Sequence, residues 1–299
     1  MQQATWELPA SWALDRTVWL NTGAPMPLLG LGTFRLQGEE AVRLSLDAAL
    51  GNGYHLVDTA AVYGNEAAIR HALSELLPCH GLARGDIFLT SKLSPRDHGE
   101  ESAERACLRS LKELGCDYLD LYLIHWPGTQ GRPQEDEGNR EQRQQSWRTL
   151  EKLHSAGKLR AIGVSNYTIR HLEDLLAGCR VPPAVLQVEF HPELAQSELL
   201  DFCRRKGIHL QAYSSLGTGQ LVGRPEVVKV AKRQGRLPAQ VLLRWALQQG
   251  VSVIPKSAST SRVAENCQLW TWDLSQVDME ELSALDCGKR YCWDPSNVA

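Results

Sequence analysis

The stretch Gly53-Tyr-His-Leu-Val-Asp-Thr-Ala-Ala-Val-Tyr-Gly-Asn-Glu66 contains one strand-to-helix unit of the expected fold and two chemically active side chains. Its apolar residues leading into Asp58 are typical of a short buried strand, and a helical pattern starts at residue 65. Tyr63 lies in the loop between them, five positions past Asp58. The same order, an apolar run and then a titratable side chain, recurs at Lys92 and His125.

Short apolar runs alternate with helical patterns along most of the chain. Strands are expected over residues 29–33, 55–58, 86–91, 118–124, 159–164, 185–190, 208–213 and 251–254. Helices are expected over residues 39–51, 65–77, 99–115, 141–156, 168–177, 195–206, 225–234, 238–249 and 260–268. Strands separated by helices of this length form right-handed βαβ units in a parallel sheet. Eight such strands favour an α/β fold, a closed (β/α)8 TIM barrel, over an open doubly wound sheet.

Residues 17–29 predict an N-terminal β-hairpin in front of the barrel. Val18-Trp-Leu and Met26-Pro-Leu-Leu flank Asn21-Thr-Gly, which is a turn signal. We therefore expect an N-terminal extension over residues 1–16 and a single barrel domain over residues 17–299. No strand is followed by Gly-x-Gly-x-x-Gly, so a Rossmann domain is not expected.

The composition argues against several classes of function. The formal net charge is −3, so no basic surface invites nucleic acid or an anionic membrane. No apolar run approaches the roughly 18 residues that a membrane helix needs. The first fifteen residues contain no Lys or Arg, which does not fit a secretory or transit peptide. The scattered cysteines are typical of a reduced cytoplasmic protein, and a local bridge between Cys287 and Cys292 is the less favoured alternative.

Four side chains at the expected barrel mouth form a candidate catalytic site: Asp58, Tyr63, Lys92 and His125. Taken singly, each has an ordinary structural explanation, such as a turn cap, a surface lysine or a core histidine. Taken together, the four residues have no ordinary structural explanation. Lys92 is expected to lower the pKa of Tyr63 from about 10, and Asp58 to keep Lys92 charged. We predict Tyr63 as the general acid for a carbonyl oxygen, which a neutral His125 orients while hydride reaches the carbon.

Polar and aromatic side chains at other strand ends predict a nicotinamide site. Ser165 and Asn166 follow the fifth strand and Gln187 lies in the sixth, and such neutral groups suit a carboxamide. Tyr213 ends the seventh strand and offers a flat face to a nicotinamide ring. A core glutamine and a packing tyrosine remain equally good explanations of single members of this set.

A phosphate site is expected after the eighth strand. Lys256, Ser257 and Arg262 can converge near the start of the last predicted helix. Two cations suit a 2′-phosphate, so NADP is favoured over NAD. The alternative is a capped helix end with solvated basic side chains.

Four stretches of the sequence closely resemble signatures of the aldo-keto reductase superfamily, namely residues 53–66, 118–127, 163–166 and 254–266. The resemblance runs from about residue 17 to the C-terminus. It implies a monomeric (β/α)8 barrel that reduces aldehydes or ketones with NADP(H), with Tyr63 as the acid. It assigns cofactor binding to Gly32, Thr33, Asp58, Ser165, Asn166, Gln187, Tyr213, Ser214, Leu216, Lys256, Ser257, Arg262, Glu265 and Asn266. It assigns substrate binding to Phe34, Val62, Tyr63, His125, Trp126 and Trp293.

The chain departs from the pattern of this family near the substrate. Phe34 stands where many members have tryptophan, and Ser94-Pro95 stands where an aromatic residue is frequent. The tail after residue 290 is shorter than in mammalian aldose and steroid reductases, so we expect a more open pocket.

The leading hypothesis is a cytoplasmic oxidoreductase acting on a small-molecule carbonyl substrate, with no nucleic-acid or membrane partner. The alternative is an NADP-binding regulatory or structural barrel with weak or no activity. A metal enzyme or serine hydrolase is not expected, because His-Glu-x-x-His, Gly-x-Ser-x-Gly and ligand clusters are missing from the sequence.

Overall fold

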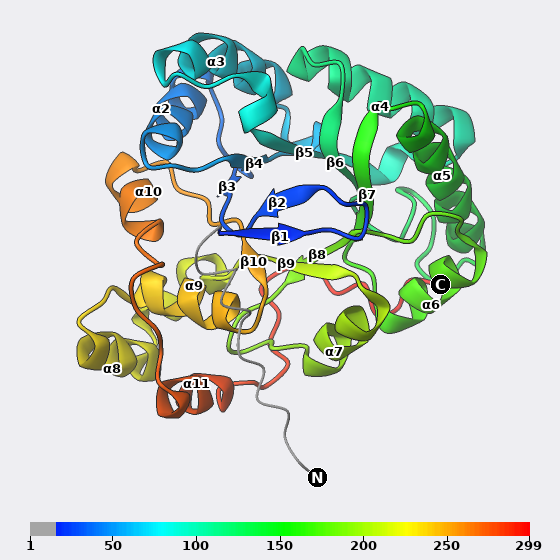
Figure 1. Ribbon diagram of the computed structural model, residues 1–299. Coiled ribbons are helices and arrows are strands. Elements are labelled where there is room, and N and C mark those ends of the chain that lie inside the picture. The colour runs from blue at the N-terminus through cyan, green and yellow to red at the C-terminus, as the bar shows by residue number, and fades with distance from the viewer. Residues whose placement is uncertain (1–15) are drawn as a thin grey trace.

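The computed structural model describes residues 16–299, so the predicted N-terminal extension lies outside the described part except for Arg16. An eight-stranded sheet occupies the centre of the molecule (Figure 1). Each strand runs parallel to the next along the chain, and a parallel bridge between Leu29 and Val253 joins the two ends. The sheet therefore closes, which confirms the predicted TIM barrel. Its strands are β3 (Leu31–Gly32), β4 (Leu56–Asp58), β5 (Phe88–Leu93), β6 (Leu119–Ile124), β7 (Leu159–Ser165), β8 (Val185–Glu189), β9 (His209–Tyr213) and β10 (Ser252–Val253).

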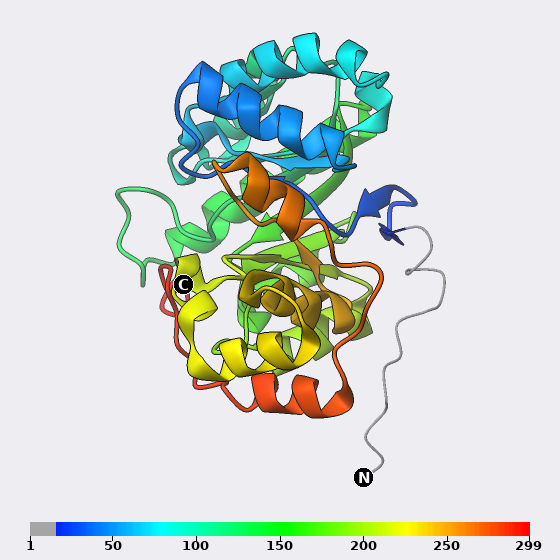
Figure 2. The same ribbon diagram turned by 90° about the vertical axis from the view of Figure 1, so that its left-hand side faces the viewer.

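Helices surround the barrel, and most lie where the sequence predicts them (Figures 1 and 2). They are α2 (Glu39–Gly51), α3 (Glu66–Cys79), α4 (Glu100–Leu114), α5 (Gly138–Ser155), α6 (Ile169–Gly178), α7 (Ser197–Lys206), α8 (Pro225–Gln234), α9 (Pro238–Gln248), α10 (Thr260–Asn266) and α11 (Gln276–Ser283). Within residues 16–299, no helix combines the length and the apolar content needed to cross a bilayer.

Two helices differ most clearly from the sequence prediction. Helix α5 starts at Gly138 rather than at residue 141, because the carboxylate of Asp136 accepts the Gly138 N–H at 2.8 Å. Helix α11 is absent from the sequence-based prediction. Its start carries a capping box, in which Ser275 and Asp278 each accept the other's backbone N–H. The Ser-x-x-Asp spacing was thus a readable signal for this helix.

Helix α4 shows how the sequence pattern places a helix on the barrel. Its small and apolar residues recur every three or four positions, and this stripe is buried while the charged residues stay outside. Gly115 then ends the helix in the left-handed region, with φ of 62°. The buried stripe consists of Ala103, Ala106, Cys107, Ser110, Leu111 and Leu114.

The predicted hairpin is present, with β1 (Thr17–Trp19) antiparallel to β2 (Pro25–Pro27). It leads directly into the amino end of β3 and lies across one end of the barrel (Figure 1). Asp58, at the carboxyl end of β4, lies at the opposite end. Met26 is completely buried, and its Sδ atom lies 3.9 Å from Nε2 of Gln211 on β9. The hairpin therefore closes the amino end of the barrel and leaves the carboxyl end for the candidate site.

Candidate active site

The four predicted catalytic side chains come together at the carboxyl ends of three neighbouring strands. Asp58 is the last residue of β4, Lys92 lies one residue before the end of β5, and His125 directly follows β6. Tyr63 ends the short 3-10 turn η1 (Ala61–Tyr63) in the loop after β4. Because adjacent parallel strands share one edge, residues far apart in sequence meet at the mouth as predicted.

Lys92 lies at the centre of this group. Its Nζ atom is 2.6 Å from Oδ1 of Asp58, 2.9 Å from the carbonyl oxygen of Thr59 and 3.4 Å from the hydroxyl of Tyr63. The Lys92 side chain is wholly buried, and an ammonium group is tolerated there only with oxygen partners. The lysine is therefore fixed between a carboxylate and a phenol.

The charges of Lys92 and Tyr63 follow from opposed effects. Burial lowers the pKa of Lys92, but Asp58 and Tyr63 outweigh it, so the pKa is raised and the ammonium persists. Burial raises the pKa of Tyr63, and the nearby Lys92 lowers it by a smaller amount. The predicted effect of the lysine is present, but the expectation of a net lowered tyrosine pKa is wrong. At neutral pH Tyr63 is a protonated phenol with a proton to give.

His125 lies edge-to-face against Tyr63, with ring centroids 5.7 Å apart. Burial and the charge of Lys92 bring the pKa of His125 well below its ordinary value, so the ring is neutral. Its Nδ1 atom is buried and has no hydrogen-bond partner among residues 16–299. A buried N–H without an acceptor is costly, which favours the tautomer with hydrogen on Nε2. Nε2 is thus the donor that His125 can offer to a substrate.

The predicted nicotinamide residues form one hydrogen-bonded group with the catalytic set. Ser165 donates to the carbonyl oxygen of Gln187 at 2.7 Å, and Tyr213 donates to Oδ1 of Asn166 at 2.6 Å. The Asn166 amide donates in turn to the carbonyl oxygen of His125 at 2.9 Å. Asn166 has φ of 63°, a backbone conformation that asparagine tolerates better than most residues. The structure therefore brings these four residues together in one hydrogen-bonded group.

Gly32 and Thr33 hold the backbone of the mouth together. The Gly32 N–H donates to the carbonyl oxygen of Pro255 at 3.1 Å, and a Cβ at this position would lie 2.5 Å from the carbonyl oxygen of Ile254. Only glycine allows β3 to approach the end of β10 so closely. The hydroxyl and the N–H of Thr33 both donate to the Asp58 carbonyl, at 2.9 and 3.0 Å.

The segment after β10 has the capped helix end, whereas the phosphate site stays a prediction. Ser259 caps α10 through the Arg262 N–H, and Ser257 is tied to the backbone of Ser259. Yet Lys256 and Arg262 are exposed, and neither forms an ion pair within the described residues. Two cations therefore remain available beside the capped end, while Asn266, the last residue of the helix, is buried.

Aromatic side chains line the rim above Tyr63. The Phe34 ring lies 5.1 Å from that of Tyr63, and the Trp126 and Trp293 rings meet edge-on at 4.8 Å. Phe34, Val62 and Trp293 are each about half exposed, which fits the expectation of an open pocket. Trp126 is fixed by a residue that the sequence did not reveal, because His98 Nε2 lies 3.0 Å from its carbonyl oxygen.

The C-terminal tail, residues 284–299, is held by two carboxylates that the sequence analysis missed. Glu189 at the end of β8 accepts the backbone N–H groups of Tyr291 and Cys292, at 2.7 and 3.1 Å. Glu193 accepts the Tyr291 hydroxyl at 2.7 Å and pairs with Arg224 at 2.9 Å. A buried carboxylate at the end of a mainly apolar strand, as at Glu189, was the available signal.

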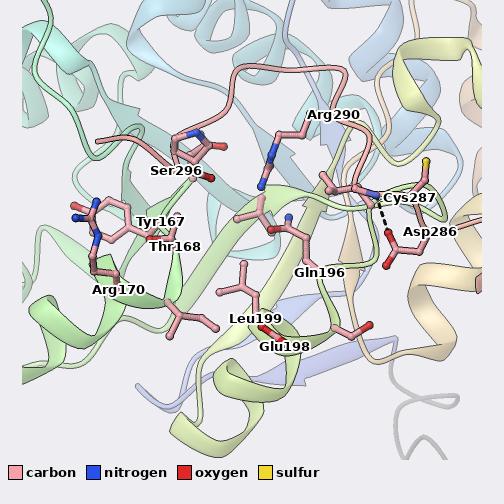
Figure 3. Close-up of a pocket in the computed structure, with 17 residues that line it drawn as sticks. Tyr167, Thr168, Arg170, Gln196, Glu198, Leu199, Asp286, Cys287, Arg290 and Ser296 are labelled. Atoms are coloured by element: carbon pink, nitrogen blue, oxygen red, sulfur yellow. Dashed lines mark hydrogen bonds between the residues drawn. The ribbon is translucent and has the colours of Figure 1, made fainter. Parts of the chain in front are cut away.

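Figure 3 shows a cavity of about 770 Å³ whose lining includes none of the four catalytic side chains. It is bounded by the first residues of α6 and α7 and by the tail, with Gln196 and Arg290 directed into it. Asn166 is the one predicted site residue in its lining. Within residues 16–299, no three His, Cys, Asp or Glu side chains are grouped so as to hold a metal ion.

Comparisons with known proteins agree with this arrangement. Residues 28–286 match the family model described as Aldo/keto reductase family. The glyoxal reductase of Bacillus subtilis (strain 168) is 42% identical over 286 residues, which cover 96% of this chain and 98% of that protein. Aldo-keto reductase family 1 member A1 of Homo sapiens is 39% identical, covering 92% of this chain and 90% of that protein.

Solved structures give the same result. An aldo-keto reductase enzyme from a Medee basin deep-sea metagenome library superposes with a TM-score of 0.86 at 35% identity, covering 95% of this chain and 99% of that one. The aldose reductase from Schistosoma japonicum gives 0.84 at 36% identity, covering 92% and 93%. With a barrel of this topology, a buried Asp–Lys–Tyr contact at its mouth and a family match over most of its length, the chain belongs to the aldo-keto reductase family.

Proposed function

We propose that the protein reduces aldehydes and ketones to alcohols with NADPH, and catalyses the reverse oxidation, with Tyr63 as general acid. The observation that carries this proposal is the contact of the buried Lys92 ammonium with both Asp58, at 2.6 Å, and the Tyr63 hydroxyl, at 3.4 Å. Family membership makes the protein an oxidoreductase, and relatives named glyoxal reductase and aldose reductase support carbonyl reduction.

The residues present fit nicotinamide adenine dinucleotide phosphate (NADP). Lys256 and Arg262 supply two exposed cations for a 2′-phosphate. In the loop after β9, the Ser215 hydroxyl is buried without a hydrogen-bond partner among the described residues, which suits a polar ligand beside Ser214 and Leu216. Ser165, Asn166 and Gln187 would hold the carboxamide, and Tyr213 would lie against the ring. When bound, this cofactor supplies the hydride.

The catalytic side chains would act on the carbonyl oxygen. Nε2–H of His125 and the Tyr63 hydroxyl donate to that oxygen and thereby fix its position. As the carbon accepts hydride, the oxygen gains negative charge and takes the proton of Tyr63. The Lys92 ammonium stabilises the phenolate left behind, and Asp58 keeps Lys92 in place. The alcohol product then carries one hydrogen on carbon and one on oxygen.

The substrate would be a small molecule that reaches Tyr63 across the aromatic rim. Phe34, Val62, Trp126 and Trp293 offer mainly apolar surface, so an apolar group next to the carbonyl is favoured. We propose a cytoplasmic monomer with an ordered mechanism, in which the cofactor enters before the carbonyl compound.

The test is the loss of NADPH absorbance with 4-nitrobenzaldehyde, for the wild type beside Tyr63→Phe at saturating cofactor. The wild type is expected to turn over, and the variant to lose at least about a hundredfold in kcat, the usual size of a proton-transfer contribution. NADPH binding, followed by quenching of protein fluorescence, should be the same in both.

A wild type that binds NADPH but reduces no aldehyde or ketone would contradict the proposal and favour a regulatory barrel. Equal activity of the wild type and Tyr63→Phe would contradict only the role of Tyr63 as general acid and would leave the proposed reaction standing.

A further inference from the structure

We propose that Gln211 is a positioning residue of this site: it fixes the amide of Gln187, and through it the carboxylate of Asp58. The inference rests on the proposed function and adds a residue to it. Gln211 lies on β9, two positions before Tyr213, and is completely buried. Strand periodicity puts both side chains on the same face of the sheet, which is the barrel interior.

The hydrogen bonds of Gln187 leave one arrangement. Its Nε2 atom lies 2.7 Å from Oδ2 of Asp58 and 2.8 Å from Oε1 of Gln211. An ionised carboxylate only accepts hydrogen bonds, so Gln187 must turn its NH2 group toward Asp58. Because the same nitrogen faces Gln211, Gln211 must present its carbonyl oxygen. Both hydrogens of the Gln187 amide are then committed.

Because both amide hydrogens are bound in this way, only the oxygen of the Gln187 side chain is left for a ligand at the mouth of the barrel. Its Oε1 atom remains as an acceptor, which is the complement of the NH2 group of a primary carboxamide. With the amide turned over, a donor would face that NH2 group and an oxygen would face the Asp58 carboxylate. Gln211 therefore acts together with Asp58 to keep Gln187 in the orientation that suits a nicotinamide.

The effect extends to the catalytic charges. Oδ1 of Asp58 accepts from Lys92 and Oδ2 accepts from Gln187, so the carboxylate is held at both oxygens. Gln211 itself is held mainly through its acceptor side, since the partner of its NH2 group is the weak acceptor Sδ of Met26, 3.9 Å away. Oε1 is thus the atom through which Gln211 holds the amide of Gln187.

A glutamine that only filled space would be replaceable by methionine, which has a similar volume. The experiment therefore compares Gln211→Met, which removes the acceptor, with Gln211→Glu, which keeps an oxygen at the same reach. Thr90→Val is the matched control, because Thr90 is buried on β5 and its hydroxyl has no partner among the described residues.

Three quantities are measured for each variant: kcat with 4-nitrobenzaldehyde, the Kd of NADPH and the thermal midpoint. Gln211→Met should lower kcat by about tenfold, the effect of one lost buried hydrogen bond. Its Kd for NADPH should change less than about threefold, because the phosphate contacts at Lys256 and Arg262 are untouched. Gln211→Glu should recover most of kcat, and Thr90→Val should match the wild type.

The emission of bound NADPH gives a readout that does not need turnover. It should differ between Gln211→Met and the wild type, because the ring would no longer be held in one environment. A Gln211→Met variant with kcat and emission equal to the wild type overturns the inference. So does an equal loss of kcat in the Met and Glu variants that follows their thermal midpoints, since that would be a purely structural effect.

Failure of the proposed function looks different. In that case the wild type reduces no carbonyl compound, while the emission comparison still decides whether Gln211 positions the ring. A wild type that does not bind NADPH contradicts both proposals.

Discussion

The carboxylate of Glu189 accepts the backbone N–H of Tyr291 at 2.7 Å, so the end of a barrel strand holds the C-terminal tail. Burial raises the pKa of Glu189, but hydrogen bonds from His191, Tyr291 and Cys292 outweigh it, and the net pKa is lowered. The carboxylate is therefore ionised and accepts from several donors at once. The tail held in this way carries Trp293 to its contact with Trp126.

Replacing Glu189 by Gln should loosen the tail. The amide NH2 group cannot accept a hydrogen bond, so one backbone N–H of the tail loses its partner, which costs about 1–3 kcal/mol. Urea unfolding should show this loss, and the KM of a bulky aldehyde should rise more than that of a small one. Glu173→Gln is the control, since Glu173 is exposed on α6. An unchanged KM for both aldehydes would mean that the tail does not form a wall of the pocket.

Lys92→Met should destabilise the protein strongly as well as abolish activity. The substitution leaves the Asp58 carboxylate buried without its ammonium partner, and breaking a buried pair in this way costs about 3–5 kcal/mol. Adding Asp58→Asn should restore part of the stability, because no uncompensated charge then remains. Urea unfolding of the two single variants and the double variant measures the coupling. If the double variant is as unstable as the sum of the single ones, the pair is not coupled.

The exposed cations should decide the choice of cofactor. Lys256→Met and Arg262→Ala should each raise the KM of NADPH by about tenfold, which corresponds to one charge-assisted hydrogen bond to phosphate. The KM of NADH should hardly change, because NADH lacks the 2′-phosphate. Lys112→Met on α4 serves as a control for the loss of surface charge. An equal rise in the KM of NADPH and of NADH would mean that these cations contact a part of the dinucleotide that both cofactors share.

The stability of the protein should fall as the pH drops below about 6.5, the ordinary histidine pKa. Burial lowers the pKa of His98, His171 and His209 to about 4 in each case. Between the two values the unfolded chain binds protons that the folded protein does not, so the neutral rings stabilise the fold at neutral pH and lose that effect on acidification. The loss by pH 5 is on the order of 2 kcal/mol per ring.

Urea midpoints at pH 7.5, 6 and 5 would measure this dependence. His209→Gln should show a smaller slope, because one of the three rings no longer takes up a proton on unfolding. A midpoint that rises on acidification would contradict the assignment of neutral buried histidines.

The barrel and the catalytic group could be predicted because each depends on local patterns. The apolar run before Asp58 and the helix after Tyr63 follow from short-range periodicity, and parallel strands bring their ends to one edge. Most residues of the proposed nicotinamide site lie at strand ends for the same reason.

Other features depend on contacts that no local pattern encodes. The bond from Gln187 to Asp58 spans 129 positions of the chain, and that from Tyr291 to Glu189 spans 102. The net pKa of Tyr63 is also a balance of burial against charge, and its sign needs the depth of burial as well as the presence of Lys92. Helix α11 is different, since its capping residues were visible and its weak apolar pattern was not enough.

The hairpin β1–β2 makes the two ends of the barrel unequal. Met26 is buried beneath it, and Phe34, Val62 and Trp293 are about half exposed at the carboxyl end, while Trp19 at the far end has 70% of its surface exposed. Attachment to a solid support through a cysteine introduced by Trp19→Cys, with the exposed Cys79 and Cys287 replaced by serine, would therefore keep the entrance clear. Immobilised protein of this kind should process substrate as fast as free protein, whereas attachment near Trp293 should obstruct it.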